Sequence, residues 1–140
     1  MKADEARRVV KEYMTALGQP DSEGLNAKGF GGAAVGEAQL YFEYRVFEAD
    51  LKASALIYKF SKPPKPGVLE GFKEEEKKGT DTGGGKVDYE SANKGLFLSR
   101  TYSTAPSPQV LQEDMQKLMK ASLVWGDEVL KRVSSSVFKT

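Results

Sequence analysis

A stretch of alternating apolar and polar residues between Gly36 and Phe60 constrains the fold of this chain more than any other feature. A period of two in aromatic and β-branched residues predicts a half-buried strand, because a helix cannot place such positions on one face. The stretch is long enough for two strands, so it predicts a long β-hairpin. In its first half the apolar positions are Leu40, Phe42, Tyr44 and Val46.

The turn of this hairpin is expected at Ala49-Asp50, with an even number of loop residues. The two strands then face each other in a defined register, and one face of the hairpin is apolar throughout except for Lys59 at its end. The cross-strand pairs predicted on that face are Val46 with Ala53, Tyr44 with Ala55, and Phe42 with Ile57.

The opposite face of the hairpin carries more apolar and aromatic surface than a face that only meets water. At roughly 25 cal/mol per Å² of apolar area, burying this surface would be a substantial driving force for association. We therefore expect this face to bind a partner protein or a second copy of the chain. The residues expected to do so are Tyr41, Phe47, Leu56, Tyr58 and Phe60.

The length of 140 residues predicts one ordinary domain that spans residues 1–140. With 39% hydrophobic and 29% charged residues, the chain belongs to the soluble globular class. No apolar run approaches the roughly 18 residues that span a bilayer, and the first residues lack the apolar core of a signal peptide. We therefore expect a cytoplasmic protein that has no membrane partner.

The chain contains neither cysteine nor histidine. Their absence excludes disulfides, thiolate nucleophiles, metal sites built on these residues, and the Ser-His-Asp arrangement. An enzyme would have to use carboxylates, lysine, tyrosine or a borrowed cofactor, and no convergent pair of such residues stands out. We therefore expect no enzyme activity, no catalytic residue, no metal and no cofactor.

Positive and negative residues nearly cancel, with 21 Lys and Arg against 20 Asp and Glu. A protein that binds nucleic acid needs several cationic side chains gathered on one surface. The best local cluster is Arg7, Arg8 and Lys11, and acidic residues are interleaved with it. We therefore expect no nucleic-acid partner.

The rest of the chain predicts further elements on both sides of the first hairpin. Apolar residues at spacings of three and four mark helices, and Ser107 followed by Pro108 is a suitable start for the last of them. Runs with a period of two mark a short strand and a second hairpin. These elements are the helix 3–17, the strand 30–35, the helix 68–78, the hairpin 86–102 and the long helix 107–133.

The second hairpin is expected to have one core face and one face that meets water. A loop at Ala92–Gly95 leaves Phe97 as the single apolar side chain on the water-facing side. The residues predicted on the core face are Val87, Tyr89, Leu96 and Leu98.

Two glycine-rich stretches look like phosphate-binding loops. Residues 29–34 match the dinucleotide pattern with Ala in the last place, and residues 83–86 read Gly-Gly-Gly-Lys. Both motifs require a following helix whose N-terminus meets the phosphate, whereas strand sequence follows each of them here. We interpret the first as a bulged or closely packed strand and the second as a flexible turn.

The element order α-β-β-β-α-β-β-α predicts a single α+β domain, with one twisted antiparallel sheet packed by helices on one face. This layout resembles the type III secretion chaperone fold from Ala3 to Val133, with its two hairpins between the first and last helices. The resemblance implies a non-enzymatic homodimer that holds an extended segment of a partner protein along apolar patches and sheet edges. Such chaperones are usually acidic, whereas this chain has a net charge of +1 and a pI near 7.8.

Another class of function is a small-ligand carrier or sensor domain. Its pocket would lie between the sheet and the C-terminal helix, near Met115, Met119 and Trp125, although these side chains can equally fill the core. In the same helix, Gly126 costs about 1 kcal/mol relative to Ala. We therefore expect close packing or a bend at that position.

Overall fold

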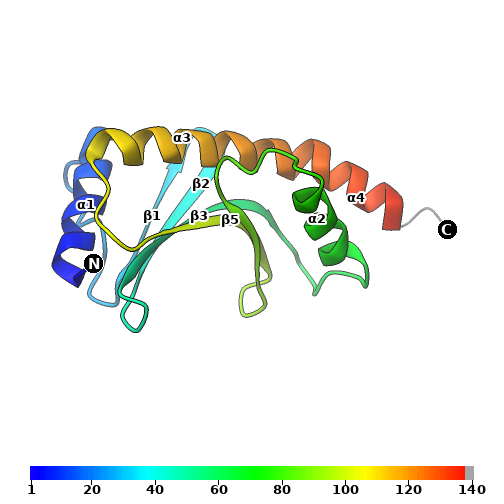
Figure 1. Ribbon diagram of the computed structural model, residues 1–140, viewed down its shortest axis with the longest axis horizontal. Coiled ribbons are helices and arrows are strands. Elements are labelled where there is room, and N and C mark those ends of the chain that lie inside the picture. Colours follow the sequence, from blue (N-terminus) through cyan, green and yellow to red (C-terminus); the bar gives the residue numbers. More distant parts are fainter. Residues whose placement is uncertain (138–140) are drawn as a thin grey trace.

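A five-stranded antiparallel sheet lies beneath one long C-terminal helix in the computed structural model, which describes residues 1–137 (Figure 1). The strands are arranged in the order β1-β2-β3-β5-β4, and the predicted element order and α+β fold are confirmed. No helix of residues 1–137 is both long and apolar enough to cross a bilayer. The elements are α1 (Ala3–Ala16), β1 (Phe30–Val35), β2 (Ala38–Arg45), β3 (Asp50–Lys59), α2 (Val68–Lys77), β4 (Lys86–Glu90), β5 (Gly95–Tyr102), α3 (Pro108–Val124), the π-helical turn η1 (Trp125–Val129) and α4 (Leu130–Val137).

The helices begin and end where local chemistry favours it. Gly18 has a φ of 85° just past α1, a conformation that glycine adopts without steric cost. The side chain of Ser107 accepts a hydrogen bond from the backbone N–H of Val110 and caps α3, as predicted. Between these ends α1 buries an apolar stripe that includes Val10 and Met14.

One hydrophobic core fills the space between the helices and the face of the sheet turned toward α1 and α3, which we call the inner face. Trp125 lies in this core and is completely buried. Its ring stacks on Phe72 of α2 with 6.1 Å between centroids, and its Nε1–H donates to the carbonyl of Asp81 at 2.8 Å. Trp125 therefore joins the C-terminal helix, α2 and the loop that leads to β4.

The first hairpin turns at 46–49, earlier than predicted. Phe42 lies opposite Ala53 and not Ile57, so the predicted register is wrong. The reason is electrostatic, because the guanidinium of Arg45 donates two hydrogen bonds of 2.7 Å to the carboxylate of Asp50 and closes the hairpin there. The shift is an even number of residues, so the inner-face positions from Leu40 to Tyr44 and from Ala53 to Ile57 are nevertheless those predicted.

The turn exposes residues that the predicted register had placed in the sheet. Val46 was expected in the core but is 73% exposed, and Phe47 is fully exposed at 101%. Ala49 completes the turn with a φ of 51°, an uncommon conformation for a residue other than glycine. These residues therefore form a projecting tip.

A β-bulge between Leu56 and Tyr58 reverses the side of the sheet to which the last residues of β3 point. Tyr58 lies opposite Leu96, an inner-face residue, and Lys59 consequently lies on the other side of the sheet from the one predicted. The bulge meets the π-helical turn, where a Cβ on Gly126 would lie 2.6 Å from the carbonyl oxygen of Ile57. The predicted close packing at Gly126 is therefore confirmed.

The second hairpin also differs from its predicted register. Tyr89 lies opposite Leu96 and Val87 opposite Leu98, because Lys94 adopts a φ of 58° and the turn closes at Glu90 and Gly95. The shift is again even, and the four predicted core-face residues lie on the inner face.

Packing explains both glycine-rich stretches. A Cβ on Gly31 would lie 2.0 Å from the carbonyl oxygen of Gly24, so β1 is the closely packed strand that was predicted. A Cβ on Gly83 would lie 2.3 Å from the carbonyl oxygen of Lys117, and Gly83 has a φ of 63°. Because these glycines lack a side chain, the backbone of Gly24 can approach β1, and the loop at Gly83 can approach the backbone of α3.

A buried carboxylate fastens α4 to α2. Glu75 is 6% exposed, and Arg132 donates to both of its oxygens at 3.1 and 3.2 Å while the hydroxyl of Thr80 donates at 2.7 Å. The hydrogen bonds from Arg132, followed by that from Thr80, lower the pKa of Glu75 to about 2. Because Arg132 is half exposed, solvent screens much of the attraction in this pair.

This cluster predicts a pH-dependent share of the stability. The folded pKa of Glu75 is below its ordinary value of 4.5, so its contribution is present above that value and is lost as the pH falls toward 2. We expect Glu75→Gln to lower the free energy of unfolding by about 1–2 kcal/mol at neutral pH and by clearly less near pH 3. Urea denaturation of both proteins at the two pH values measures this, and an equal loss at both would contradict it.

Candidate functional site

The face of the sheet turned away from the helices, which we call the outer face, is concave and uncovered. In Figure 1 the sheet arches beneath α3, and the β2–β3 and β4–β5 turns extend downward on either side of the arch. A groove of about 540 Å³ lies on this face. We call it the outer groove, and the residues used here to define it are Phe30, Tyr41, Ser54, Leu56, Lys59 and Phe97.

Aromatic and aliphatic side chains line the middle of the outer groove. The rings of Tyr41 and Phe97 meet edge to face at 5.8 Å, and Leu56 lies opposite Phe97 on the neighbouring strand. Tyr41 lies against Gly32, where a Cβ would be 3.4 Å from its ring. Phe97 is only 7% exposed, so the expectation that this side of the second hairpin simply meets water is wrong there. The curvature of the sheet buries it under Tyr41.

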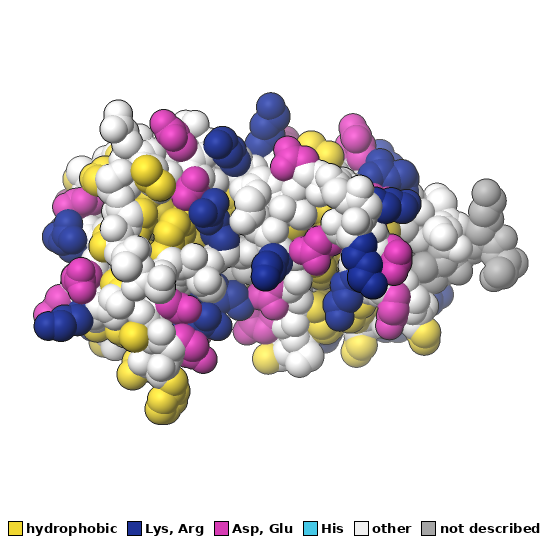
Figure 2. Space-filling view, viewed as in Figure 1, with side chains coloured by type: hydrophobic (Ala, Val, Ile, Leu, Met, Phe, Trp, Pro, Cys, Tyr) yellow, Lys and Arg dark blue, Asp and Glu magenta, His cyan; other side chains and the backbone are white. Residues whose placement is uncertain are grey.

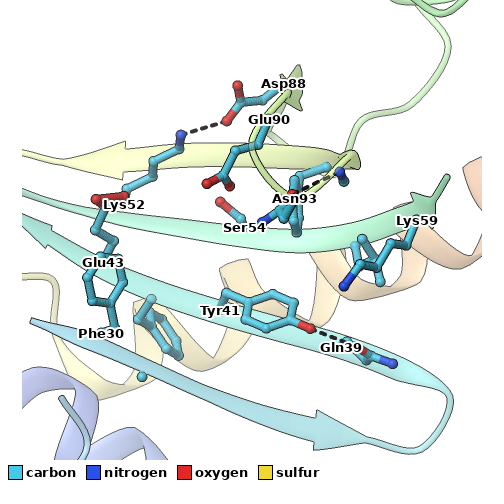
Figure 3. Close-up of a pocket in the computed structure, with 15 residues that line it drawn as sticks. Phe30, Gln39, Tyr41, Glu43, Lys52, Ser54, Lys59, Asp88, Glu90 and Asn93 are labelled. Carbon is cyan, nitrogen blue, oxygen red and sulfur yellow. Dashed lines mark hydrogen bonds and ion pairs between the residues drawn. The ribbon is translucent and has the colours of Figure 1, made fainter. Parts of the chain in front are cut away.

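A chain of polar contacts borders this apolar strip (Figure 3). The ammonium of Lys52 lies 2.6 Å from the carboxylate of Asp88, which also accepts a hydrogen bond of 3.1 Å from Ser99. The hydroxyls of Ser99 and Ser54 are 2.8 Å apart. This network satisfies the polar groups at the centre of the sheet.

Other charges of the groove lack such partners. Within residues 1–137, Glu43, Lys59 and Glu90 form no salt bridge, although Lys59 and Glu90 flank Gly95 from the two neighbouring strands. Gly95 has no side chain to fill the space between them. These groups are therefore available to a bound molecule.

The structure does not bring the five residues predicted to bind a partner onto one face. Tyr41 and Leu56 line the outer groove, and Phe47 lies at the tip of the β2–β3 turn. The bulge turns Tyr58 toward the inner side, where its ring meets Phe60 at 4.9 Å, and Phe60 in turn meets Tyr89 at 6.3 Å. The prediction of a single shared face is therefore wrong, while the binding role of these residues stays a prediction.

Sequence reasoning missed two groove residues. Phe30 is half exposed at the start of β1, and Phe97 lies beneath Tyr41. Phe97 had a signal, because it is the only aromatic residue among the polar ones on its side of the second hairpin. Phe30 had none, since it begins a strand diluted by glycine.

The edge of the sheet at β1 is open. Both backbone groups of Phe30 point away from β2, because its carbonyl accepts from the N–H of Asn26 at 2.8 Å and its N–H donates to the Asn26 side chain at 3.0 Å. Backbone groups alternate along a strand, so those of Gly32 and Ala34 also point outward. Among residues 1–137 these outward groups have no partner.

The opposite edge, at β4, is partly closed. The carboxylate of Glu76 in α2 accepts a hydrogen bond of 2.9 Å from the outward N–H of Val87. Covering or capping a strand in this way prevents another chain from pairing with it. Each edge therefore has one residue with a partner outside the sheet, and β1 keeps two residues, Gly32 and Ala34, whose outward backbone groups are uncovered.

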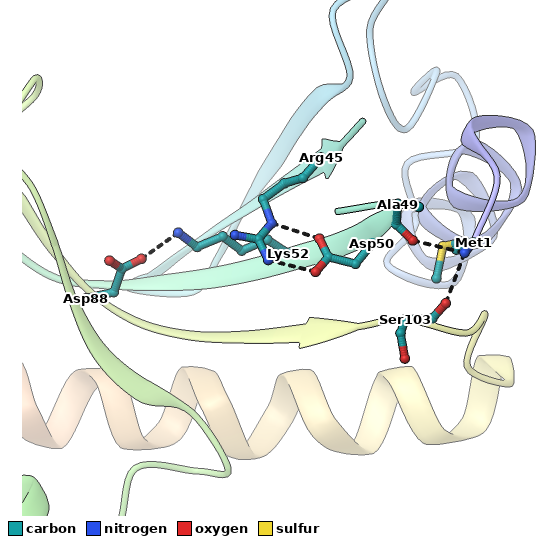
Figure 4. A network of polar contacts seen from close by, with 7 residues as sticks. All are labelled: Met1, Arg45, Ala49, Asp50, Lys52, Asp88 and Ser103. Atoms are coloured by element: carbon teal, nitrogen blue, oxygen red, sulfur yellow. Dashed lines mark hydrogen bonds and ion pairs between the residues drawn. The ribbon is translucent and has the colours of Figure 1, made fainter. Parts of the chain in front are cut away.

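The tip of the β2–β3 turn is held in place (Figure 4). The Arg45 guanidinium, through its hydrogen bonds, holds the pKa of Asp50 below its usual value, so the pair stays charged across the neutral range. The amino group of Met1 donates to the carbonyls of Ala49 at 2.9 Å and Ser103 at 3.0 Å. The Arg45–Asp50 pair thus joins the two strands at the turn, and Met1 links the turn to the segment after β5.

The residues considered for a small-ligand pocket are part of the core. Met115 and Trp125 are completely buried and Met119 is 7% exposed, and all three belong to the core cluster. Their side chains therefore fill the interior and do not line an open pocket. In residues 1–137 no group of three or more acidic side chains is placed to hold a metal ion.

Comparison with known proteins finds solved structures that share this fold. No family model matches the sequence, and no curated protein sequence matches it at a significant level. A chain in the crystal structure of the ExsC-ExsE complex matches with a TM-score of 0.69 and 10% identity, over 89% of this chain and 92% of that chain. A chain in the structure of the HopA1-SchA chaperone-effector complex matches with a TM-score of 0.63 and 12% identity, over 89% of this chain and 95% of that one. The chain therefore has the fold of the type III secretion chaperones, as its layout suggested.

Proposed function

We propose that this chain is a non-enzymatic, chaperone-like protein-binding domain that holds an extended segment of a partner protein along the open edge of β1. The observation that carries the proposal is the pair of outward-facing backbone positions at Gly32 and Ala34, next to the outer groove. Both similar structures are complexes, and one is a complex of a chaperone with an effector.

Strand addition suits the chemistry of this edge. An extended segment that pairs with β1 would receive main-chain hydrogen bonds from Gly32 and Ala34, which supply affinity without demanding a particular sequence. Gly32 carries no side chain, so a side chain of the segment could lie over it and reach Tyr41, which lies opposite Gly32 on β2. The apolar strip of the groove would then favour segments whose alternate residues are apolar.

We propose in addition that the chain acts as a homodimer, through some of the five residues named at the outset. Three of them, Tyr41, Phe47 and Tyr58, are substantially exposed apolar side chains. Large apolar side chains that are left exposed on a soluble protein favour self-association.

Site-specific photo-crosslinking tests the binding site. A photoreactive phenylalanine at Ala34 is expected to crosslink a partner protein in the cells that naturally produce this chain. The matched control places it at Val110, an exposed position on α3. The crosslinked segment is then synthesised as a labelled peptide and its binding to the purified chain is measured by fluorescence anisotropy. A peptide that binds equally well after the β1 edge is blocked would overturn the proposal.

A further inference from the structure

We infer that this chain has a second binding site, for the phosphate group of a small organic phosphate, between α3 and the loop that leads to β4. Arg100 lies at its centre, Lys117 and Lys120 of α3 lie on one side, and the backbone of Gly84 lies on the other. We call these four residues the phosphate site. It is separate from the proposed function, because β4 and β1 are the opposite edges of the sheet.

Two neighbouring hollows meet at Arg100. One, of about 520 Å³, lies between the loop and α3, and the other, of about 450 Å³, lies on the outer face at the start of β4. Gly84 and Arg100 line both of them. Gly84 has no side chain to cover the guanidinium, and a Cβ at this position would lie 2.8 Å from its Nη1. A ligand can therefore approach Arg100 past the backbone of Gly84.

Arg100 has a hydrogen-bond donor that the protein does not use. Its Nη2 pairs with the carboxylate of Asp114 at 3.3 Å, and its guanidinium carbon lies 5.0 Å from the centre of the Tyr102 ring. These contacts hold the guanidinium in place. Its Nε is buried and has no acceptor among residues 1–137. Because a buried charged donor without an acceptor is unfavourable, a ligand oxygen gains more by binding this guanidinium than by binding an exposed ammonium.

The surroundings of Arg100 are positive, although the chain as a whole is nearly neutral. Five cationic side chains and three carboxylates line the two hollows. The three carboxylates are already bonded within the protein, in the pairs Asp88 with Lys52, Asp114 with Arg100, and Asp81 with the backbone N–H of Gly83. Within residues 1–137, Lys86, Lys117 and Lys120 form no salt bridge. Figure 2 shows cationic side chains around the middle of α3, where Figure 1 places this loop. An anion would neutralise this excess.

A phosphate group suits these donors better than a carboxylate does. It carries close to two negative charges at neutral pH and three acceptor oxygens. One oxygen can therefore meet Arg100 while another lies near the ammonium groups of Lys117 and Lys120. The backbone N–H of Gly84 has no acceptor within residues 1–137 and is a further donor. The loop thus contributes a single N–H and not the helix N-terminus of a phosphate loop, since strand β4 follows it.

The rest of the ligand would meet apolar surface. Ala121 and Val124 of α3 line the hollow between the loop and α3, and Val124 is 41% exposed. Small-molecule sites have volumes of roughly 300–1,000 Å³, and this hollow has room for more than a phosphate ion alone. The expected ligand is therefore a monophosphate of a small apolar or aromatic group, and phenyl phosphate is a suitable probe.

NMR titration of the isotope-labelled full chain with phenyl phosphate, at constant ionic strength, tests the site. We expect a saturable shift of the Gly84 amide with a Kd of about 0.1–1 mM, as for other ligands of this size. Benzoate carries one charge and no phosphate oxygens, so it should bind at least about 10-fold more weakly.

Variants locate the binding residues. Arg100→Lys keeps the charge and loses the planar guanidinium, so it should weaken phenyl phosphate binding about 10-fold. Replacing both Lys117 and Lys120 by glutamine should weaken it about 3- to 10-fold. The matched control is Lys73→Gln, an exposed lysine on α2 that lines neither hollow, and it should leave the affinity unchanged. Circular dichroism confirms that each variant is folded.

The outcomes decide the inference without reference to β1. Unchanged affinity in the double lysine variant, or shifts that leave Gly84 unaffected, would overturn the site even if Arg100→Lys fails to fold. Equal affinity for benzoate would overturn the preference for phosphate, and the absence of any saturable shift would overturn both. None of these results affects binding of a partner segment, which the crosslinking at Ala34 tests by itself.

Discussion

Replacing Trp125 by alanine is expected to lower the free energy of unfolding by about 3–5 kcal/mol, a large part of the stability of a domain of this size. The side chain is completely buried and stacks on Phe72, and its N–H is the donor to the Asp81 carbonyl. Truncation would remove the stacking, leave a cavity where three elements meet, and leave that carbonyl without its partner. Urea denaturation followed by circular dichroism measures the loss.

A graded series identifies the physical cause. Trp125→Phe retains most of the stacking and removes the hydrogen bond, so it should cost about 1–3 kcal/mol, between wild type and Trp125→Ala. Val110→Ala, on the exposed side of α3, should change the stability by less than about 0.5 kcal/mol. A cost below 1 kcal/mol for Trp125→Ala would show that this residue does not hold the core together.

Ala34→Pro is expected to weaken binding of the partner segment by about 10- to 100-fold. Proline removes the outward N–H that an added strand would use, and it leaves a carbonyl of the segment unpaired at a cost of about 1–3 kcal/mol. That N–H takes no part in pairing with β2, so the fold of an edge strand tolerates the change. Fluorescence anisotropy with the crosslinked segment as a labelled peptide measures the affinity.

Ala34→Val is the matched control for this experiment. Valine keeps the N–H and favours extended backbone, so the affinity should equal or exceed that of the wild type. The free energy of unfolding of both variants, measured by urea denaturation, should lie within about 1 kcal/mol of the wild-type value. Equal binding by the proline and valine variants would show that the segment does not pair with the edge of β1.

The faces of the strands were predictable, although their registers were not. The turns predicted at Ala49-Asp50 and at Ala92–Gly95 were both misplaced, and in each hairpin the register shifted by an even number of residues. Residues such as Phe42 and Leu98 therefore kept their inner facing, because alternation along a strand depends only on parity. The period of two in the sequence reports the face directly, while the register depends on which turn is closed most favourably.

The misplaced turn had a local cause that periodicity cannot report. Arg45 and Asp50 are five positions apart in the sequence, and only once the hairpin forms do they meet as a bidentate ion pair. The pair fixes the turn between them and leaves Phe47 at its tip. A search for oppositely charged residues that flank a candidate turn would have favoured this register.

The bulge in β3 was not predicted, and it changed the predicted binding face more than any other feature did. It moves Tyr58 and Phe60 away from the face that they share with Tyr41 in a regular strand. Its counterpart is the close approach of Gly126 to the Ile57 carbonyl, a contact between residues far apart in the sequence. In the sequence, only Gly126 indicated close packing, and the sequence alone could not show that Gly126 would meet the backbone of β3.

The concavity of the outer face and the difference between the two edges depend on the whole sheet. Phe97 is buried on a largely polar face because the sheet curves and brings Tyr41 over it. The edge at β4 is partly closed by Glu76 of α2, the helix that precedes β4 in the chain. The edge at β1 stays open because its neighbour in the chain, Asn26, closes only Phe30.

Hydrogen exchange of the β1 amides, followed by NMR with and without the crosslinked segment, tests the central proposal most directly. The amides of Gly31 and Ala33 face β2 and should exchange slowly in both states, whereas those of Gly32 and Ala34 should exchange rapidly alone and slowly in the complex. Unchanged exchange at Gly32 and Ala34 in a saturated complex would contradict binding of the segment along this edge.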